Sequence, residues 1–331
     1  MKTKNIIKGL SLLFAVLAFG SCKKESENIF TMFKDVKVTF EDRGPYAITE
    51  DAVVNDGDSV NIYYTITSPN QAMFQVAVDS TQGNGVVATR KINLDESQRH
   101  EYSGVIRMKM QRDGKTTFRV YGLSEDNIFL GDGYTSITVE EKASYIYLTN
   151  RKVYTHVIEL PEGSGSIADG KMTGERKSFF SLATGESFNY EEATANSDKI
   201  DFGIYFKIDT RETNYGDLVY NLYSPSTSEN PLPELDMSGW TKRNTLFSAP
   251  IEAAQPTFVN DLSSSSKIQE KAEAVDISLT QSAISESGKA FSPGNMYYFL
   301  TPEGKYGAIY ISQLSSDAIG GYFSISVKIQ K

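Results

Sequence analysis

Histidine is the side chain best suited to acid–base chemistry near neutral pH, and this chain of 331 residues contains only two. His100 lies in the charged stretch SQRHEYSG, where we expect a solvated turn. His156 alternates with Tyr154 and Ile158 in a run that favours a β-strand, so we expect a half-buried histidine with a satisfied ring. The sequence also lacks the common motifs of metalloproteases, serine hydrolases and nucleotide-binding enzymes. Histidine-based catalysis is therefore not predicted.

A pair of carboxylates could still hydrolyse a glycosidic bond, because the two acids need not be close in sequence. Candidates are Glu191, Glu192, Asp198 and Asp201, but the chain has 42 acidic residues and no pair stands out. Asp201 lies in an apolar run, where a buried carboxylate must be paired or hydrogen-bonded. We interpret Asp201 as a structural acid that fixes a neighbouring loop. A glycoside hydrolase remains an alternative function.

The only cysteine, Cys22, follows an N-terminal segment with the layout of a secretory signal. Three lysines accompany an apolar run over residues 10–19, which is shorter than the roughly 20 residues that span a bilayer. Residues 19–22, FGSC, resemble the lipobox of bacterial lipoproteins, with phenylalanine in place of the usual leucine. The resemblance implies that Cys22 carries the lipid. We predict a signal peptide over residues 1–21, and a lipidated cysteine with a flexible tether over residues 22–33.

The composition narrows the class of partner. The formal net charge is −9 and the sequence pI is about 5.0, so nucleic acid and anionic membrane surfaces are poor partners. With Cys22 used for the anchor, no disulfide, thiolate metal site or cysteine nucleophile remains. We predict no cofactor and no metal, and membrane contact through the lipid alone. The expected location is the outer membrane of a cell envelope, exposed at the surface.

Residues 34–142 contain short alternating runs separated by turn residues, such as VNIYYTI at 60–66 and TTFRVY at 116–121. About seven such runs without a long amphipathic helix favour an immunoglobulin-like (Ig-like) β-sandwich. Residues 116–141 resemble the last hairpin of Ig-like modules in Bacteroidota surface lipoproteins. We interpret this domain as a spacer.

Residues 143–331 predict a larger, mainly antiparallel β-domain, so that the whole protein is all-β with one or two short helices. One helix is expected over residues 190–195, where Asn189 can cap and Glu192 occupies the third helical position. A second is expected in KIQEKAEAV, residues 267–275. Residues 224–260 carry several prolines and the only tryptophan, and we expect a long irregular loop there.

Two blocks of the larger domain carry a further resemblance. Residues 178–206 and 295–330 resemble blocks in uncharacterised Bacteroidota lipoproteins and, more distantly, in HmuY-like haem-binding lipoproteins. The resemblance implies a β-rich fold whose last strands end the chain, and it makes haem binding a second alternative. Met172, Met237 and Met296 match no pair of that family's ligands, so haem is not predicted.

The remaining candidates for ligand binding are aromatic: Trp240, Tyr215 and Tyr223. Flat aromatic faces can pack against sugar rings or partner side chains. Trp240 stands out because it lies in a polar loop without an alternating pattern, although it could instead pack the loop onto its own domain. The sequence thus predicts a surface-anchored, non-catalytic binding lipoprotein, for a glycan or a surface protein, that serves adhesion or nutrient capture.

Overall fold

The computed structural model describes residues 36–131, 134–157, 176–208, 218–233, 235–282 and 290–331. The chain divides into two compact units. Among the described residues, the first comprises 36–52, 60–108 and 115–139, and the second comprises the remainder. No helix in these described ranges is long and apolar enough to cross a membrane. The predicted signal peptide, Cys22 and the tether up to residue 33 lie outside the described residues.

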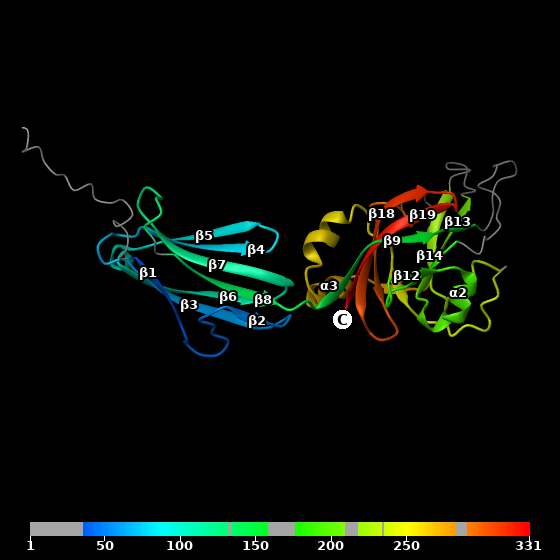
Figure 1. Cartoon of the computed structure of the whole chain (residues 1–331), viewed down its shortest axis with the longest axis horizontal. Coiled ribbons are helices and arrows are strands. Elements are labelled where there is room, and N and C mark those ends of the chain that lie inside the picture. The colour runs from blue at the N-terminus through cyan, green and yellow to red at the C-terminus, as the bar shows by residue number, and fades with distance from the viewer. Residues whose placement is uncertain (1–35, 132–133, 158–175, 209–217, 234, 283–289) are drawn as a thin grey trace, which may run out of the picture. The chain divides into compact units, whose positions relative to one another are not determined.

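The first unit is built on two β-sheets (Figure 1). The smaller sheet has the order β1 (Lys37–Glu41), β3 (Ser59–Thr67), β6 (Glu101–Lys109), and the short 3-10 turn Glu96–Gln98 precedes β6. The larger sheet has the order β2 (Ala52–Val54), β8 (Thr135–Glu141), β7 (Gly114–Leu123), β4 (Gln75–Gln82), β5 (Val87–Asn93). Side chains of both sheets form one core, so the predicted Ig-like sandwich is confirmed.

The alternating pattern of the sequence accounts for this core. In β3 the side chains of Val60, Ile62, Tyr64 and Ile66 are buried, whereas the residues between them are partly exposed. Successive side chains of a strand point to opposite faces, so a period of two gives one apolar face and one polar face. The sandwich therefore follows from local sequence alone.

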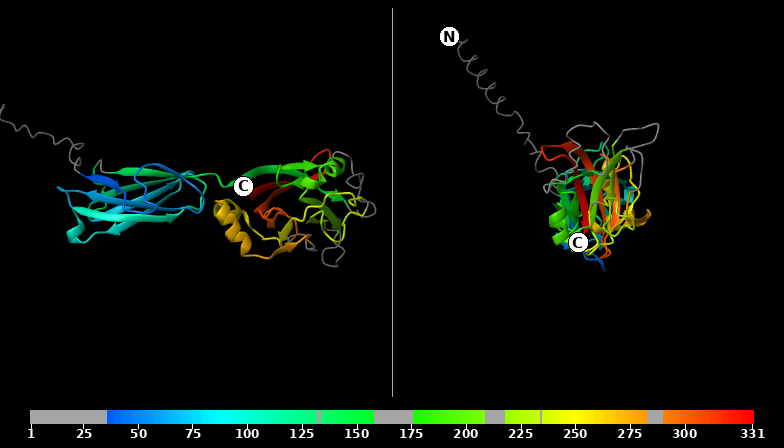
Figure 2. Two further views of the ribbon diagram at one scale, coloured as in Figure 1. Left: turned by 90° about the horizontal axis from the view of Figure 1, so that it is seen from below. Right: turned by 90° about the vertical axis from the view of Figure 1, so that its right-hand side faces the viewer.

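The second unit contains two further sheets, which are antiparallel except for the pairing of β10 with β13. One has the order β16 (Ile277–Leu279), β15 (Leu246–Ser248), β17 (Met296–Leu300), β18 (Tyr306–Ser316), β19 (Gly321–Gln330), β9 (Tyr145–Tyr154). The other has the order β10 (His156–Val157), β13 (Phe202–Ile208), β11 (Phe179–Ser181), β12 (Glu186–Phe188), with β14 (Leu218–Tyr223) paired to β13. Figure 2 shows β19 in red beside β9 in green. The predicted mainly antiparallel β-domain is confirmed.

Three apolar clusters hold the second unit together. The first joins both sheets through side chains such as Phe202 and Phe323, so the sheets pack face to face. The second covers the outer face of the six-stranded sheet with α3 (Ser265–Glu273) and the π-helical turn Thr257–Asp261. The third covers the outer face of the five-stranded sheet with α2 (Tyr190–Ala195) and the side chains of Leu232, Leu235, Met237 and Trp240. Figure 1 shows α2 and α3 at opposite ends of this unit.

Both predicted helices are present. The first, α2, has the predicted bounds, because Asn189 Oδ1 accepts a hydrogen bond from the backbone N–H of Glu192 and Glu192 Oε2 accepts one from the N–H of Asn189. The second, α3, begins at Ser265, before the predicted start, because the Ser264 side chain accepts from the N–H of Lys267. Local capping chemistry therefore sets the start of each helix.

The segment 224–260 departs from the expected long loop in two ways. It contains β15, which pairs with β16 and β17, and the first residues of the π-helical turn. It also buries Leu232, Leu235 and Met237 against the five-stranded sheet. Isolated apolar residues without a regular period gave no signal for this burial in the sequence.

Candidate functional site

An open trough of about 580 Å³ lies in the second unit where β9, β12 and α2 come together. Ser187 Oγ of β12 donates to the Lys152 carbonyl of β9 at 2.6 Å, which joins the edges of the two sheets. Gly185 precedes β12 with a φ of +70°, and a Cβ there would lie 2.8 Å from Leu148 Cδ1. Glycine thus allows the turn before β12 to approach β9 closely. The trough is lined mainly by polar side chains: Asn150, Arg151, Lys152, Lys177, Glu186, Glu192 and Asn196.

Strand β9 carries an irregularity at the trough. Leu148 pairs with Val327 and Arg151 pairs with Ile325, so two residues of β9 stand opposite one residue of β19. Asn150 within this bulge has a φ of +51°, in the left-handed region that favours glycine and asparagine. Asn150, Arg151 and Lys152 all line the trough. The pairing is regular after the bulge, with Arg151 opposite Ile325 and Lys152 opposite Ser324, so the bulge affects the position of Asn150 beside Arg151.

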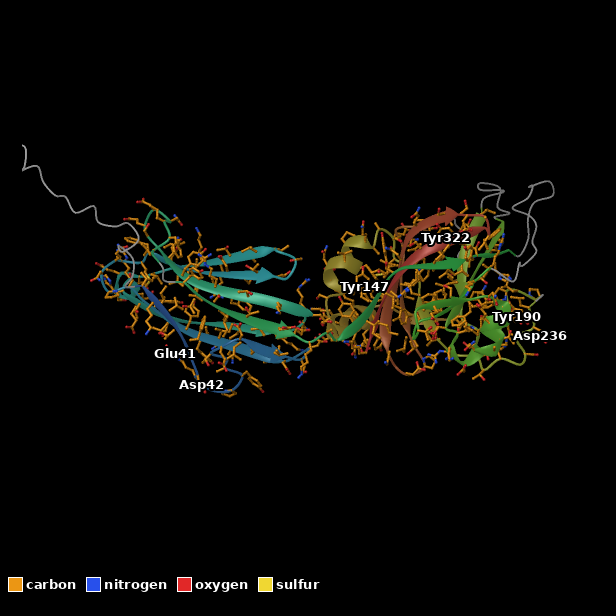
Figure 3. The ribbon with its side chains drawn as sticks, in the orientation of Figure 1. Glu41, Asp42, Tyr147, Tyr190, Asp236 and Tyr322 are labelled. Atoms are coloured by element: carbon orange, nitrogen blue, oxygen red, sulfur yellow. The ribbon has the colours of Figure 1, made fainter. Side chains whose placement is uncertain are left out.

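Lys152 is held by a carboxylate and two aromatic rings. Its ammonium pairs with Asp317, which also accepts a hydrogen bond of 2.8 Å from the Tyr154 hydroxyl. The same ammonium lies 3.9 Å from the ring centroid of Tyr322, a residue labelled in Figure 3. The hydrogen bond from Lys152 is the main reason that the pKa of Asp317 lies well below its usual range. The charge of Lys152 is therefore compensated within the protein.

Lys177 is compensated in a similar way by α2. Its Nζ lies 3.1 Å from Glu192 Oε1, while Glu192 Oε2 accepts the backbone N–H of Asn189. The hydrogen bond from Asn189, followed by that from Lys177, lowers the pKa of Glu192. This carboxylate stays ionised at neutral pH and fixes Lys177 at the rim of the trough.

Arg151 and Glu186 differ from the other charged residues of the trough. Both are exposed, and within the described ranges neither side chain makes a hydrogen bond or an ion pair. A guanidinium presents several N–H donors in a planar fork, and a carboxylate presents acceptors only. The trough can thus offer donors and acceptors to a polar ligand without first breaking a contact at these two residues.

Of the three aromatic residues that the sequence suggested for ligand binding, Trp240 and Tyr223 are buried. Trp240 is 7% exposed, its ring lies 5.1 Å from that of Phe179, and its Nε1 donates to Thr194 Oγ1 of α2 at 3.2 Å. Tyr223 is fully buried against Phe179 and Tyr205. The expected platform at these two positions is corrected, because both rings belong to the apolar cluster that also contains Phe179 and Ala193 of α2. Tyr215 lies outside the described residues.

Asp201, the expected structural acid, is fully buried and hydrogen-bonded through both oxygens. Oδ1 accepts from Arg243 Nε and Thr245 Oγ1, each at 2.8 Å, and Oδ2 accepts from the backbone N–H of Leu182 at 2.7 Å. Arg243 also holds both carboxylate oxygens of Glu303 at 2.7 and 2.8 Å. Burial raises the pKa of Asp201, whereas the bond from Arg243 lowers the pKa of Glu303 to about 2. The interpretation of Asp201 as an acid that fixes a neighbouring loop is confirmed.

The other candidate acids are exposed, and both histidines have a polar neighbour. Glu191 and Asp198 are exposed on and next to α2. His156 is more buried than expected, at 3% exposure, and its Nδ1 lies 2.9 Å from Ser178 Oγ. Burial, reinforced by Arg176, lowers the pKa of His156 to about 4. His100 is exposed, as expected, and its Nδ1 lies 2.8 Å from the Ser68 carbonyl oxygen.

No metal centre is formed by the residues that the structure describes, since no three histidine, cysteine or acidic side chains gather in a suitable group.

Sequence reasoning missed the trough as a whole. Its only local signal is TNR at residues 149–151, a polar interruption of the strand YIYLTNRKVY that could have indicated a bulge.

No protein-family model matches the chain, and no curated protein matches it in sequence. Among solved structures, the fibronectin(III)-like modules of Clostridium thermocellum CbhA match 32% of this chain and 95% of their own at 16% identity, with a TM-score of 0.19. A Bifidobacterium dentium β-glucuronidase complexed with coumarin-3-O-glucuronide matches 38% of this chain at 14% identity and a TM-score of 0.19. The matched region spans 20% of the glucuronidase chain.

Proposed function

We propose that this protein is a surface-anchored, non-catalytic binding lipoprotein whose second unit binds a glycan in the trough between β9, β12 and α2. The observation that carries the proposal is the trough itself: about 580 Å³ of open space lined by amides, cations and carboxylates on three elements. Ligand sites for small molecules commonly occupy roughly 300–1,000 Å³. Such a space suits a few sugar units.

The lining chemistry favours a hydroxyl-rich ligand. Asn150 can donate and accept hydrogen bonds, Glu186 can accept from hydroxyl groups, and Arg151 can donate to ring or carboxylate oxygens. Phe188 adds a half-buried aromatic ring at the same trough. Sugars combine hydroxyl groups with apolar ring faces, so they match this mixture. A protein partner needs a larger contact, typically about 800 Å² on each side.

The hydrogen bonds and ion pairs of the acidic side chains favour binding over catalysis. Hydrolysis by two carboxylates needs one acid poised to give a proton and a second one free to attack or to activate water. Glu192 is held by Asn189 and Lys177, and Asp201 by Arg243, Thr245 and Leu182. Glu186 is thus the acid of the trough with no partner in the described part of the chain, and one carboxylate does not make a pair.

The anchor belongs to the proposal on the strength of the sequence alone. The lipobox-like FGSC and the polar stretch after Cys22 would tether the protein to a membrane by lipid, with the Ig-like sandwich as a spacer. Labelling of the expressed full-length chain with a lipid precursor, compared with Cys22→Ser, tests this part. Incorporation that depends on Cys22 is expected, and equal labelling of both chains would refute the anchor.

Glycan binding is tested with the soluble chain of residues 23–331 on an array of neutral and acidic glycans. The matched variant is Lys177→Gln, which keeps a polar side chain but removes a rim charge. We expect binding by the wild-type chain that weakens in the variant. A chain that retains no glycan while capturing a protein partner would shift the function to adhesion or complex assembly.

A further inference from the structure

The charged side chains of the trough differ in whether they form an ion pair within the protein. Lys152 is neutralised by Asp317, and Lys177 is neutralised by Glu192. Arg151 is left as the one cation of the trough without an ion pair within the described residues. A ligand that brings an oxyanion would find this guanidinium already accessible, and Arg binds carboxylate and sulfate groups through two parallel N–H donors.

The backbone at Arg151 is shaped by the same bulge that turns Asn150 into the trough. Asn150 has a φ of +51°, a conformation that costs free energy for a residue with a side chain and that glycine adopts freely. Glycine and asparagine both adopt this conformation, but only asparagine carries a side-chain amide. Asparagine at this position keeps a side-chain amide beside the free guanidinium, where it can donate to the same oxyanion or to a neighbouring hydroxyl.

Glu186 supplies the complementary group on the facing element. It projects from β12 with no partner in the described ranges, and as a carboxylate it accepts hydrogen bonds but repels a second anion nearby. A ligand that fits both residues must carry its negative charge on the β9 side and hydroxyl donors on the β12 side. An acidic sugar has this arrangement, since one ring bears an oxyanion and several hydroxyl groups.

We infer that the bulge of β9 is a recognition element for an acidic sugar, with Arg151 and Asn150 on its oxyanion and Glu186 on its hydroxyl groups. This inference rests on the proposed glycan binding and names the class of glycan. Carboxylated and sulfated sugars share the chemistry that Arg151 recognises, so the test includes both.

The test uses calorimetric titration of the soluble chain of residues 23–331 with three probes. These are an oligogalacturonide, its methyl ester and a heparin-derived sulfated oligosaccharide. The methyl ester keeps the ring and hydroxyl groups but has lost the charge. We expect either the oligogalacturonide or the sulfated oligosaccharide to bind at least roughly tenfold more tightly than the methyl ester. This difference in affinity should become smaller as the salt concentration is raised.

Three variants assign the effect to the bulge. Arg151→Gln should weaken binding of the charged probe by roughly tenfold or more while leaving the ester unchanged. Arg107→Gln is the matched control, because it removes an exposed arginine from β6 in the first unit. Asn150→Gly preserves the left-handed backbone and removes only the amide, so it should weaken binding by roughly threefold to tenfold with an unchanged melting temperature.

The outcomes separate this inference from the proposed function. Equal affinity for the ester and for both charged probes, or an Arg151→Gln variant that binds the charged probes like the wild type, would overturn the acidic-sugar inference and leave glycan binding intact. A lower melting temperature of Asn150→Gly with an unchanged affinity for the charged probe would show that Asn150 has a structural role. It would overturn the proposal that Asn150 binds the ligand. Absence of binding to all probes and to neutral glycans would refute the proposed function, and this inference with it.

Discussion

The two sides of α2 contrast in what they do with their side chains. On one side, Thr194 and Tyr190 meet Trp240, and the Tyr190 hydroxyl donates to the carbonyl of Asp236 at 2.7 Å, as the neighbouring labels in Figure 3 illustrate. On the other side, Glu192 and Asn196 line the open trough. The closed side buries aromatic rings, and the open side holds charges in fixed positions.

This difference shows that the buried aromatic rings and the proposed binding residues lie on different sides of α2. A buried aromatic ring removes a large apolar area from water and so stabilises the fold. The polar side chains of the trough bury little apolar area and contribute little to stability, and they remain available to a ligand. Substitutions on the two sides should therefore separate stability from binding.

The largest effect is expected for Trp240→Ala. Truncation of a buried aromatic side chain commonly costs about 3–5 kcal/mol of unfolding free energy, because it loses apolar contacts and leaves a cavity. Chemical denaturation measures the loss, and Trp240→Phe should recover a large part of it. If Trp240→Ala unfolded like the wild type but lost glycan binding, the ring would belong to a binding platform after all.

A somewhat smaller effect is expected for Asp201→Ala, which breaks a buried ion pair. Removal of one partner typically costs about 3 kcal/mol or more, because the remaining charge loses its compensation. The loss of unfolding free energy should be smaller here, because Arg243 keeps its ion pair with Glu303. Denaturation of Asp201→Ala, Arg243→Ala and the double variant gives the coupling energy, and additive losses would contradict a shared network.

A cost of about 1 kcal/mol is expected for Asn189→Ala, which removes the cap shared by both sides of α2. The N–H of Glu192 then loses its acceptor, and the first turn of the helix frays. The melting temperature should fall by a few degrees, with Asn189→Asp as the conservative control. An equally large loss in Asn189→Asp would show that the side-chain oxygen is not the stabilising group.

The smallest effect concerns the pH dependence contributed by Glu192. Its pKa in the folded protein lies below the value of 4.5 expected when unfolded, chiefly because of the bond from Asn189. The unfolded chain therefore takes up this proton first as the pH falls below about 4.5, and stability falls with it. Glu192→Gln should lower stability at pH 7 by a few tenths of a kcal/mol and leave stability at low pH nearly unchanged, so the acid sensitivity becomes smaller. An identical pH profile for variant and wild type would contradict this role.

Prediction succeeded where the determining interactions are local. The alternation in β3 gives the sandwich core, and the Asn189–Glu192 capping box gives the bounds of α2. The burial of Asp201 with a partner also followed from a single carboxylate in an apolar run. In each case, residues within a few positions of one another contain the required information.

Prediction failed where distant segments decide the environment. Trp240 sits among polar neighbours in the sequence, and nothing there indicates that Phe179 and α2 cover it. Likewise, Arg151 and Glu186 belong to different sheets, and their neighbourhood depends on the packing of those sheets and on the hydrogen bond from Ser187. No local pattern encodes that contact.

The sequence by itself thus determined the all-β class, the sandwich of the first unit and the two helices of the second. It did so because strand alternation and helix capping act over neighbouring residues. Only the tertiary structure decided that Trp240 is buried and that Asn150 and Arg151, at the bulge of β9, line the trough. Both outcomes depend on how β-sheets pack face to face, which is a property of side chains far apart along the chain.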